Sequence, residues 1–200
     1  MKQRDLKEKI IPNKTMDVHP YYIKLYLRQA NIPPRFKFTK DNPFPAIGEK
    51  FKPAWEKIKN LLLEDKNIIL CGPPGTGKTT LACGGLQFYI IEKASPGYYV
   101  KALPMLKCII ENWNKKPSYI YYDLLVIDEI DILPDNDLFK INLFEVLDER
   151  YAYEIPTILI SNRTLKELRE FIGVRIIERL LENGEYIPCN WENFRKGGGK

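Results

Sequence analysis

The residues Gly72 to Thr79 have the types and the spacing of a loop that binds phosphate groups. They read Gly-Pro-Pro-Gly-Thr-Gly-Lys-Thr and match the pattern G-x-x-x-x-G-K-[ST]. Glycine adopts backbone angles that other residues avoid, so the main chain can come close to an anion. The N–H groups of the loop and of a following helix would point at the phosphates, and the helix dipole adds favourable charge. The motif therefore predicts binding of a nucleoside triphosphate, against the alternative of a glycine-rich surface turn with a solvated lysine.

Within this motif, the side chains have separate expected roles. Lys78 would reach the outer phosphates, and the Thr79 hydroxyl would provide one ligand to Mg²⁺. GTP is not expected, because the segment 114–117, Asn-Lys-Lys-Pro, lacks the aspartate of the N-K-x-D motif that reads guanine. The predicted cofactors are therefore ATP and Mg²⁺. The predicted nucleotide-binding residues are Gly72, Pro73, Pro74, Gly75, Thr76, Gly77, Lys78, Thr79 and Thr80.

Acidic residues follow an apolar run further along the chain. Residues 124–127, Leu-Leu-Val-Ile, indicate a buried strand, and Asp128 and Glu129 come directly after it. Asp128 would hold Mg²⁺ directly or through water. Glu129 would orient and deprotonate the water that attacks the γ-phosphate. The alternative is a pair of acids that caps the next element, and Asp131, a third acid nearby, is expected to be structural.

An amide follows a second apolar run, residues 157–160, at Asn162. A neutral amide at the end of a strand beside the acids could hydrogen-bond both the lytic water and the γ-phosphate, and so sense whether triphosphate is present. The alternative is an ordinary Ser-Asn turn or helix cap. We favour the sensor because the phosphate loop and the acids accompany it.

Arginines near the C-terminus form the last group. Arg175 and Arg179 lie four residues apart on one face of a predicted helix, and Arg195 follows the last predicted strand. An arginine supplied to a γ-phosphate from a neighbouring subunit contributes roughly 10³ to 10⁵ in rate. The alternative is ion pairing with nearby acids, namely Glu170, Glu178 or Glu182.

Alternating strands and helices must position these groups. Such alternation predicts an α/β fold with a parallel sheet covered on both faces, whose ligands gather at the carboxyl ends of the strands. The predicted strands are 68–71, 97–100, 124–127, 157–160 and 185–188. The predicted helices are 21–30, 51–63, 79–91, 103–113, 138–153, 165–171 and 174–181.

Charge divides the chain of 200 residues unevenly. Residues 1–60 carry 14 basic and 6 acidic side chains, although the whole chain has a net charge of only +5. We expect two parts: a basic N-terminal partner-binding arm and linker at 1–45, and an ATPase domain at 46–200. The basic arm favours an acidic partner, nucleic acid above all, against the alternative of a solubilising arm.

The cysteines and the apolar runs bear on the compartment. Four cysteines without a C-x-x-C pair argue against a zinc site and a disulfide framework. No apolar run approaches the length of a membrane span, and the charged start of the chain is not a secretory signal. The expected location is the cytoplasm, with no membrane partner.

Several of these stretches, taken together, resemble a known family. They are GPPGTGKT, LLVIDEID, TILISN and the tail GVRIIERLLENGEYIPCNWENFR, preceded by NIPPRFKF at 31–38. The family is that of the DnaC-type replicative helicase loaders of bacteria and phages, which are AAA+ ATPases of the initiator clade. The resemblance covers about residues 31–196. The phosphate-loop and DE motifs are common to many ATPases, whereas G-x-R-x-x-x-R-L followed by W-E-x-F-R is more discriminating.

The resemblance implies a phosphate-loop (AAA+) α/β/α fold in three layers, with a central parallel sheet and a short or absent C-terminal lid. It implies a slow ATPase, regulated by DNA or a partner, that loads a replicative helicase onto single-stranded DNA. By position it makes Glu129 the base, Asn162 the first sensor and Arg175 a finger acting on a neighbouring subunit of an ATP-dependent homo-oligomer. Arg179 and Arg195 are weaker candidates, and Arg150 has no assigned role. The candidates for binding single-stranded DNA are Tyr98, Tyr99, Lys101, Lys107, Trp113, Lys115 and Lys116, with a core position as the alternative for Tyr99 and Trp113.

Two other functions stay open on the sequence. An IstB-like transposition helper is an ATPase of the same clade and would share every residue named for hydrolysis. A small-molecule kinase built on the same loop belongs to a different class. Such kinases usually carry an arginine-rich lid and lack an asparagine after the sensor strand, so Asn162 argues against this reading.

Overall fold

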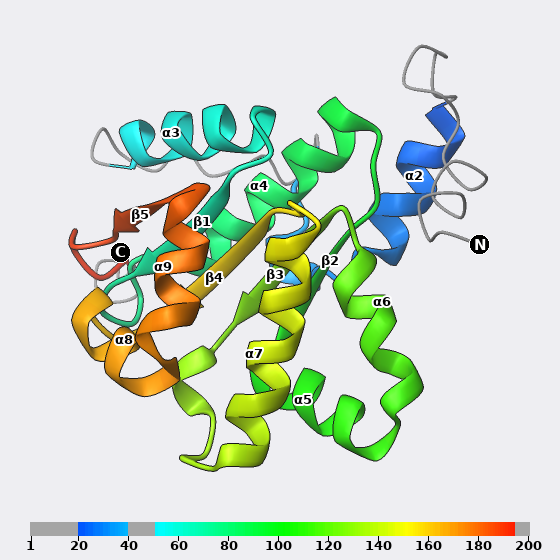
Figure 1. Cartoon of the computed structure of the whole chain (residues 1–200). Helices are drawn as coiled ribbons and strands as arrows, with labels where there is room; N and C mark the ends of the chain where they lie inside the picture. The colour runs from blue at the N-terminus through cyan, green and yellow to red at the C-terminus, as the bar shows by residue number, and fades with distance from the viewer. Residues whose placement is uncertain (1–19, 40–50, 195–200) are drawn as a thin grey trace.

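The computed structural model describes residues 20–39 and 51–194, which form a five-stranded sheet between two layers of helices (Figure 1). The strands run parallel, in the order β2-β3-β4-β1-β5 across the sheet. Their bounds are β1 Asn67–Cys71, β2 Gly97–Lys101, β3 Leu124–Asp128, β4 Thr157–Ser161 and β5 Gly184–Pro188. The five predicted strands and the parallel α/β arrangement are confirmed.

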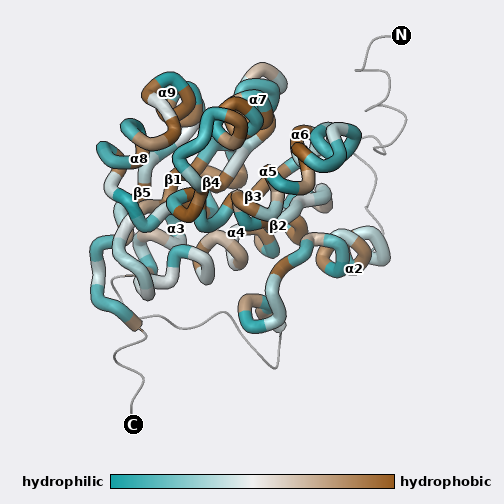
Figure 2. Tube along the Cα trace, turned by 90° about the horizontal axis from the view of Figure 1, so that it is seen from below, coloured by the Kyte–Doolittle hydropathy of each residue, from teal (hydrophilic) through white to brown (hydrophobic). Residues whose placement is uncertain are grey.

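The helices divide between the two faces of the sheet, and Figure 2 shows the row of strands between the two layers. One layer holds α2 (Pro20–Gln29), α3 (Lys52–Leu63) and α4 (Lys78–Lys93). The other holds α5 (Ala102–Glu111), α6 (Lys116–Tyr121), α7 (Asp137–Ala152), α8 (Leu165–Ile172) and α9 (Val174–Glu182). Three short 3₁₀ turns connect them: η1 (Pro34–Phe36), η2 (Trp113–Lys115) and η3 (Ile130–Ile132).

Both faces of the sheet are apolar, because both are covered by helices. Along β1, Ile68 and Leu70 belong to the core beneath α3 and α4, while Ile69 and Cys71 belong to the core beneath α5, α7, α8 and α9. All five residues of β1, of β3 and of β4 are buried. This explains why these strands read as continuous apolar runs in the sequence.

Helix α6 is the one element of regular α-structure in the described residues that the sequence did not predict. It has six residues, which is less than two turns and too short to show an apolar period. Pro117 stands in its first turn, where proline is tolerated because no helical N–H is needed there. No part of the described chain contains a helix long and apolar enough to cross a bilayer.

The N-terminal segment 20–39 packs on the body of the protein. Ala30 and Ile32 are buried in the same core as α3 and α4. The buried side chain of Gln87 on α4 clasps the segment: its Nε2 donates to the Phe36 carbonyl at 3.1 Å, and its Oε1 accepts from the Phe38 N–H at 2.9 Å. The predicted domain boundary near residue 46 lies outside the described residues.

The same segment also reaches the outer strand of the sheet. The Tyr99 N–H of β2 donates to the Ala30 carbonyl at 2.9 Å. The Asn31 side-chain amide donates to the Tyr99 carbonyl, also at 2.9 Å. Both backbone groups of Tyr99 on the open side of β2 are therefore satisfied by the N-terminal segment.

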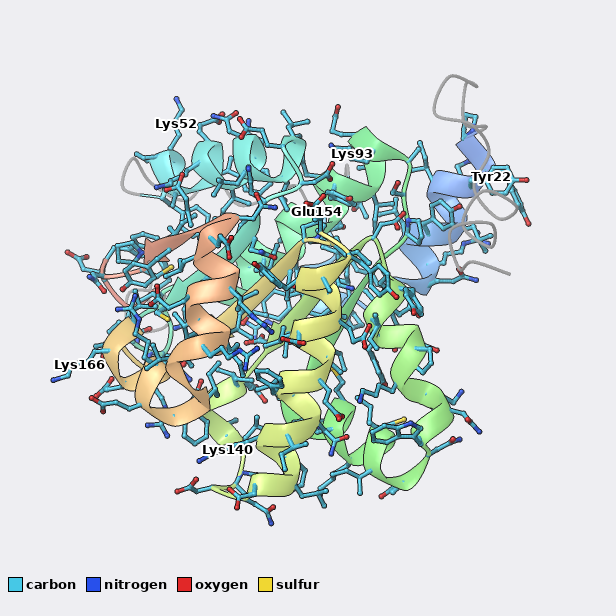
Figure 3. The ribbon with its side chains drawn as sticks, viewed as in Figure 1. Tyr22, Lys52, Lys93, Lys140, Glu154 and Lys166 are labelled. Atoms are coloured by element: carbon cyan, nitrogen blue, oxygen red, sulfur yellow. The ribbon has the colours of Figure 1, made fainter. Side chains whose placement is uncertain are left out.

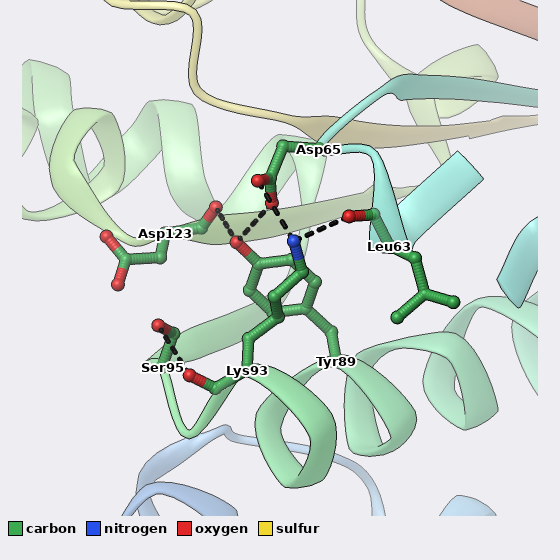
Figure 4. A network of polar contacts seen from close by, with 6 residues as sticks. All are labelled: Leu63, Asp65, Tyr89, Lys93, Ser95 and Asp123. Atoms are coloured by element: carbon green, nitrogen blue, oxygen red, sulfur yellow. Dashed lines mark hydrogen bonds and ion pairs between the residues drawn. The ribbon is translucent and has the colours of Figure 1, made fainter. Parts of the chain in front are cut away.

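A polar network holds the far end of α4 (Figure 4). The buried Tyr89 hydroxyl donates to the Asp65 carboxylate at 3.0 Å. Lys93 donates to the same carboxylate at 3.0 Å and to the Leu63 carbonyl at 2.6 Å. These contacts join the last turn of α4 to the end of α3, so the helix that starts at the phosphate loop is fixed at its other end.

Arg150, to which the sequence assigned no role, is a buried structural hub. Its side chain is 1% exposed, and its guanidinium donates to the carbonyls of Tyr119, Ile120, Tyr122 and Pro156 and to the Thr157 hydroxyl. Burial lowers its pKa, and the nearby Asp123 carboxylate opposes that effect. Arg150 therefore ties α7 to the chain before β3 and to the start of β4.

Replacing Arg150 with methionine is expected to lower the free energy of unfolding by at least about 3 kcal/mol. Each buried acceptor left without a donor costs about 1–3 kcal/mol, and this change strips donors from several at once. The measurement is urea denaturation followed by circular dichroism. Arg28→Met, at an exposed position on α2, is the matched control and should change the midpoint little. Equal midpoints for the two variants would contradict the role of Arg150.

Candidate active site

The predicted phosphate loop leaves the end of β1 and leads into α4. Gly75 and Gly77 have φ angles of 85° and 83°, in the left-handed region that favours glycine. Lys78 begins α4 and is 5% exposed. Its Nζ donates to the carbonyls of Gly72 at 2.6 Å and Pro73 at 2.8 Å, so the ammonium group lies folded against the loop. The predicted strand–loop–helix context of the motif is confirmed.

Burial lowers the pKa of Lys78, and nearby ionisable groups, Asp128 and Asp131 among them, oppose that effect. A buried ammonium group that contacts only carbonyl and hydroxyl oxygens is stabilised by a nearby anion, because burial has removed most of the water that would solvate its charge. We therefore expect Lys78 to attract an anion, such as a phosphate, to the mouth of the loop.

Thr79 and Asp128, the two predicted Mg²⁺ ligands, lie together. The Thr79 hydroxyl donates to Asp128 Oδ2 at 2.8 Å, and the Tyr99 hydroxyl donates to the same oxygen at 2.8 Å. The Glu129 N–H donates to the other oxygen, Oδ1, at 2.7 Å. Burial raises the pKa of Asp128, while the hydrogen bonds from Thr79 and Tyr99 lower it. The carboxylate is thus held in one orientation at the carboxyl end of β3.

The donor set fits Mg²⁺. A hydroxyl and a carboxylate oxygen are hard ligands, and Mg²⁺ is commonly held by one or two protein groups together with substrate phosphates. Among the described residues there is no cluster of three or more His, Cys, Asp or Glu side chains that could hold a metal. Thr79 and Asp128 would therefore hold Mg²⁺ in company with the nucleotide.

Glu129, the predicted base, has a strained backbone and an ion-pair partner. Its φ is 57°, in the left-handed region that non-glycine residues seldom adopt. Its Oε1 accepts from Lys101 Nζ at 2.8 Å, and the two side chains are 36% and 48% exposed. Lys101 ends β2, which is the neighbour of β3. The residue proposed to handle water is therefore held by a lysine from the adjacent strand.

Replacing Lys101 with methionine is expected to raise basal ATP hydrolysis by up to about fivefold. An exposed ion pair contributes about 0.2–1 kcal/mol, and Glu129 must leave this pair before its carboxylate can turn to a water. Steady-state phosphate release measures the effect. Combining the change with Glu129→Gln should remove the gain entirely. A lower rate in Lys101→Met would show that the lysine assists hydrolysis instead of restraining the base.

Asn162 and Asp131 form a second pair at this edge of the sheet. The Asn162 N–H donates to Asp131 Oδ1 at 2.9 Å, and its side-chain Nδ2 donates to Asp131 Oδ2 at 2.9 Å. Asp131 therefore fixes the amide with its NH₂ group engaged and its oxygen turned away. The structural role expected for Asp131 consists of orienting the predicted sensor.

The structure does not bring the arginines into this group. Arg175 is exposed, and its guanidinium carbon lies 5.5 Å from the Phe144 ring centre on α7. Arg179 forms an ion pair with Asp148 of α7, so its partner is not one of the predicted acids. Arg175 and Arg179 both approach Phe144, which confirms that they share one helical face. Arg195 lies outside the described residues.

The candidate residues for binding single-stranded DNA divide into buried and exposed side chains. Tyr99 is 4% exposed and serves Asp128, so it is a core residue here. Trp113 is 58% exposed, with Lys116 Nζ 4.0 Å from its ring centre. Lys116 also forms an ion pair with Glu145, while Lys107 and Lys115 are exposed. The core alternative is therefore correct for Tyr99 and wrong for Trp113, and Tyr98 is half-buried and stacks on Tyr122 at 4.7 Å.

Sequence reasoning missed three partners of the site residues. Tyr99 is predicted as a DNA-binding residue and not as a hydrogen-bond donor to Asp128. Neither the Lys101–Glu129 pair nor the Asp131–Asn162 pair is predicted. In the register of β2 with β3, Lys101 lies opposite Asp128 and Tyr99 lies opposite Val126, so the Tyr99 and Asp128 side chains share one face of the sheet. The sequence carries no signal for this register. The pairing of Asp131 with Asn162 depends on a turn, η3, that leaves no periodic signal.

Comparisons with known proteins identify relatives of this chain. Over 137 residues the chain is 26% identical to the replicative helicase loader DnaC of Escherichia coli K12, covering 64% of this chain and 56% of that protein. It therefore spans little more than half the length of this relative. Over 190 residues it is 28% identical to the insertion sequence IS21 putative ATP-binding protein of Pseudomonas aeruginosa, covering 84% of this chain and 68% of that protein.

A solved structure and a family profile complete the comparison. A crystal structure of the DnaC helicase loader superposes with a TM-score of 0.64 at 19% identity, covering 70% of this chain and 90% of that one. This likeness confirms the predicted three-layer α/β/α fold with a central parallel sheet. Residues 56–198 match the profile of the family described as IstB-like ATP-binding proteins. The chain therefore belongs to the family of IstB-like ATP-binding proteins.

Proposed function

We propose that this chain hydrolyses ATP and uses the cycle to load a replicative helicase onto single-stranded DNA. The observation that best supports hydrolysis is the hydrogen bond of 2.8 Å from the Thr79 hydroxyl to Asp128 Oδ2. Glu129 is the next residue in the chain, and Lys78 lies at the loop. A site for binding alone needs no water-activating carboxylate at this place. The DnaC relatives, which are replicative helicase loaders, support the context of replication.

In the proposed mechanism, the loop amides and Lys78 hold the β- and γ-phosphates. Thr79 and Asp128 would hold Mg²⁺, which would supply positive charge to the phosphate oxygens. The Tyr99 hydroxyl donates to Asp128 Oδ2 and so keeps the Asp128 carboxylate from rotating. Glu129 leaves Lys101 and accepts a proton from the attacking water, while Asn162 accepts a hydrogen bond from that water through its free oxygen. Water thus attacks phosphorus, and ADP and phosphate leave.

DNA and helicase would contact different parts of the surface. Trp113 offers an exposed ring for stacking, worth about 1–3 kcal/mol per base, and Lys107 and Lys115 would follow the phosphates. Tyr21 and Tyr22 of α2 are 62% and 42% exposed, and Tyr22 points outward from the body in Figure 3. We assign this face of α2, with the basic residues that precede it, to the protein partner.

A transposition helper is the second candidate, because the IS21 relative matches a larger share of this chain than DnaC does. Its catalytic residues would be the same, and only the protein partner would differ. In either case Arg175 would act as the finger on a neighbouring subunit's γ-phosphate, which requires an assembly formed in ATP. The exposure of Arg175 on α9 is compatible with that role.

Two measurements test the proposal. Phosphate release with and without single-stranded DNA should show slow hydrolysis that DNA changes at least severalfold, with no phosphorylated acceptor. Co-purification with a replicative helicase, in ATP and in ADP, should recover a complex that depends on the nucleotide. Hydrolysis without any helicase complex would favour the transposition helper, and phosphate appearing on a small acceptor would favour the kinase.

A further inference from the structure

The residues that follow β5 lie directly on the phosphate loop. We call residues 189–194 the tail segment. Its backbone joins the end of β1 through the Cys189 N–H, which donates to the Cys71 carbonyl at 2.7 Å. Its side chain at Trp191 donates from Nε1 to the Thr76 carbonyl at 2.6 Å, and the Phe194 N–H donates to the Gly75 carbonyl at 3.0 Å. The W-E-x-F motif of the sequence therefore contacts the phosphate loop, and the proposed hydrolysis mechanism gives it no role.

Packing reinforces these hydrogen bonds. Phe51, 2% exposed, lies between the loop and the tail segment, with ring centres 5.8 Å from Trp191 and 6.1 Å from Phe194. A Cβ at Gly77 would lie 3.1 Å from the Phe51 ring, and a Cβ at Gly75 would collide with the Asn193 amide. Loop and tail segment are in direct contact along both glycines.

The direction of these hydrogen bonds decides what they do. In a trans peptide unit the C=O and the N–H point in opposite directions. A donor on the Gly75 carbonyl therefore turns the Thr76 N–H away from the tail segment, and a donor on the Thr76 carbonyl does the same for the Gly77 N–H. The tail segment binds the outward-facing carbonyls of the loop, and the N–H groups stay directed at the phosphate position.

We propose that the tail segment is a brace that holds the phosphate loop ready for nucleotide, with Trp191 as its positioning residue. This rests on the nucleotide site of the proposed function. A glycine-rich loop has many backbone conformations, and fixing them at the moment of binding costs affinity. The brace fixes the loop when the chain folds, so less conformational entropy is lost when nucleotide binds. It therefore acts on nucleotide affinity, and the chemical step depends on Glu129.

The test compares Trp191→Phe with Trp55→Phe in the full chain. Phenylalanine keeps a ring against Phe51 but removes the N–H donor. A lost hydrogen bond of ordinary strength corresponds to about a three- to tenfold loss of affinity. We expect Trp191→Phe to raise the Kd for a fluorescent ADP analogue and the KM for ATP by this factor, with kcat and Tm close to wild type. Trp55, which packs on Phe88 of α4 at 6.2 Å, is the control and should change neither constant.

A second measurement keeps the proposal falsifiable if the variant folds poorly. Hydrogen–deuterium exchange of the wild-type chain should show residues 189–194 equally or better protected when ADP is bound. Faster exchange there on binding would mean that nucleotide expels the tail segment, and would overturn the brace. Unchanged affinity in a folded Trp191→Phe would overturn it as well. A wild-type chain that binds no nucleotide would sink the proposed function itself, which is a distinct result.

Discussion

Replacing Lys78 with alanine is expected to weaken ATP binding by about 100-fold. Its Nζ is buried and touches only oxygen acceptors, the carbonyls of Gly72 and Pro73 and the Thr76 hydroxyl. A triphosphate would exchange those weak partners for charged oxygens, and a hydrogen bond to a charged group contributes about 1.5–3 kcal/mol. The measurement is titration of a fluorescent ATP analogue against the purified variant.

The control for this change is Lys166→Ala. Lys166 is exposed on α8 and extends away from the body in Figure 3, so its removal alters the net charge equally without touching the loop. Affinity should then match wild type. If Lys78→Ala bound ATP as tightly as Lys166→Ala, the loop would not be the phosphate site.

Replacing Glu129 with glutamine is expected to leave ATP bound but to slow hydrolysis by about 10²- to 10⁴-fold. Glutamine keeps the size of the side chain and can still contact Lys101, but it cannot take a proton from water. The neighbouring Asp128 stays in place through Thr79 and Tyr99, so the metal position should persist. Single-turnover hydrolysis of radiolabelled ATP separates this loss from any change in binding.

Glu154→Gln provides the comparison for the loss of one carboxylate. Glu154 is exposed and lies between α7 and β4, at the end of the sheet opposite to the phosphate loop. It should hydrolyse ATP at the wild-type rate. Normal turnover by Glu129→Gln would make the assignment of the base wrong, and a loss of nucleotide binding would assign Glu129 to the metal instead.

The parts that the sequence predicted well are those with a local cause. Three of the five strands, β1, β3 and β4, are apolar runs, which follow from burial on both faces, and the phosphate loop is defined by residues within eight positions of one another. The end of β3 likewise places Asp128 and Glu129 by simple succession. Such short-range patterns do not depend on the tertiary fold, and the predicted positions of the strands and of the helix after the loop are confirmed.

The contacts that were not predicted join distant parts of the chain. Trp191 reaches Thr76 across 115 positions, and Tyr99 reaches Asp128 across 29. Arg150 has no role assigned from the sequence, and most of its acceptors are backbone carbonyls, which any residue could supply. No local pattern marks such pairs, because their partners are chosen by the register of the sheet and by the path of loops.

The outermost strand of a sheet ordinarily presents unpaired backbone groups that can recruit a strand from another molecule. β2 occupies that place, and at Tyr99 the N–H and the carbonyl are already taken by Ala30 and Asn31. Ala30 and Asn31, just after α2, thus oppose the pairing of another molecule's strand with β2 at Tyr99. The residues that follow the partner-binding helix α2 therefore help to keep copies of the protein from extending one another's sheets.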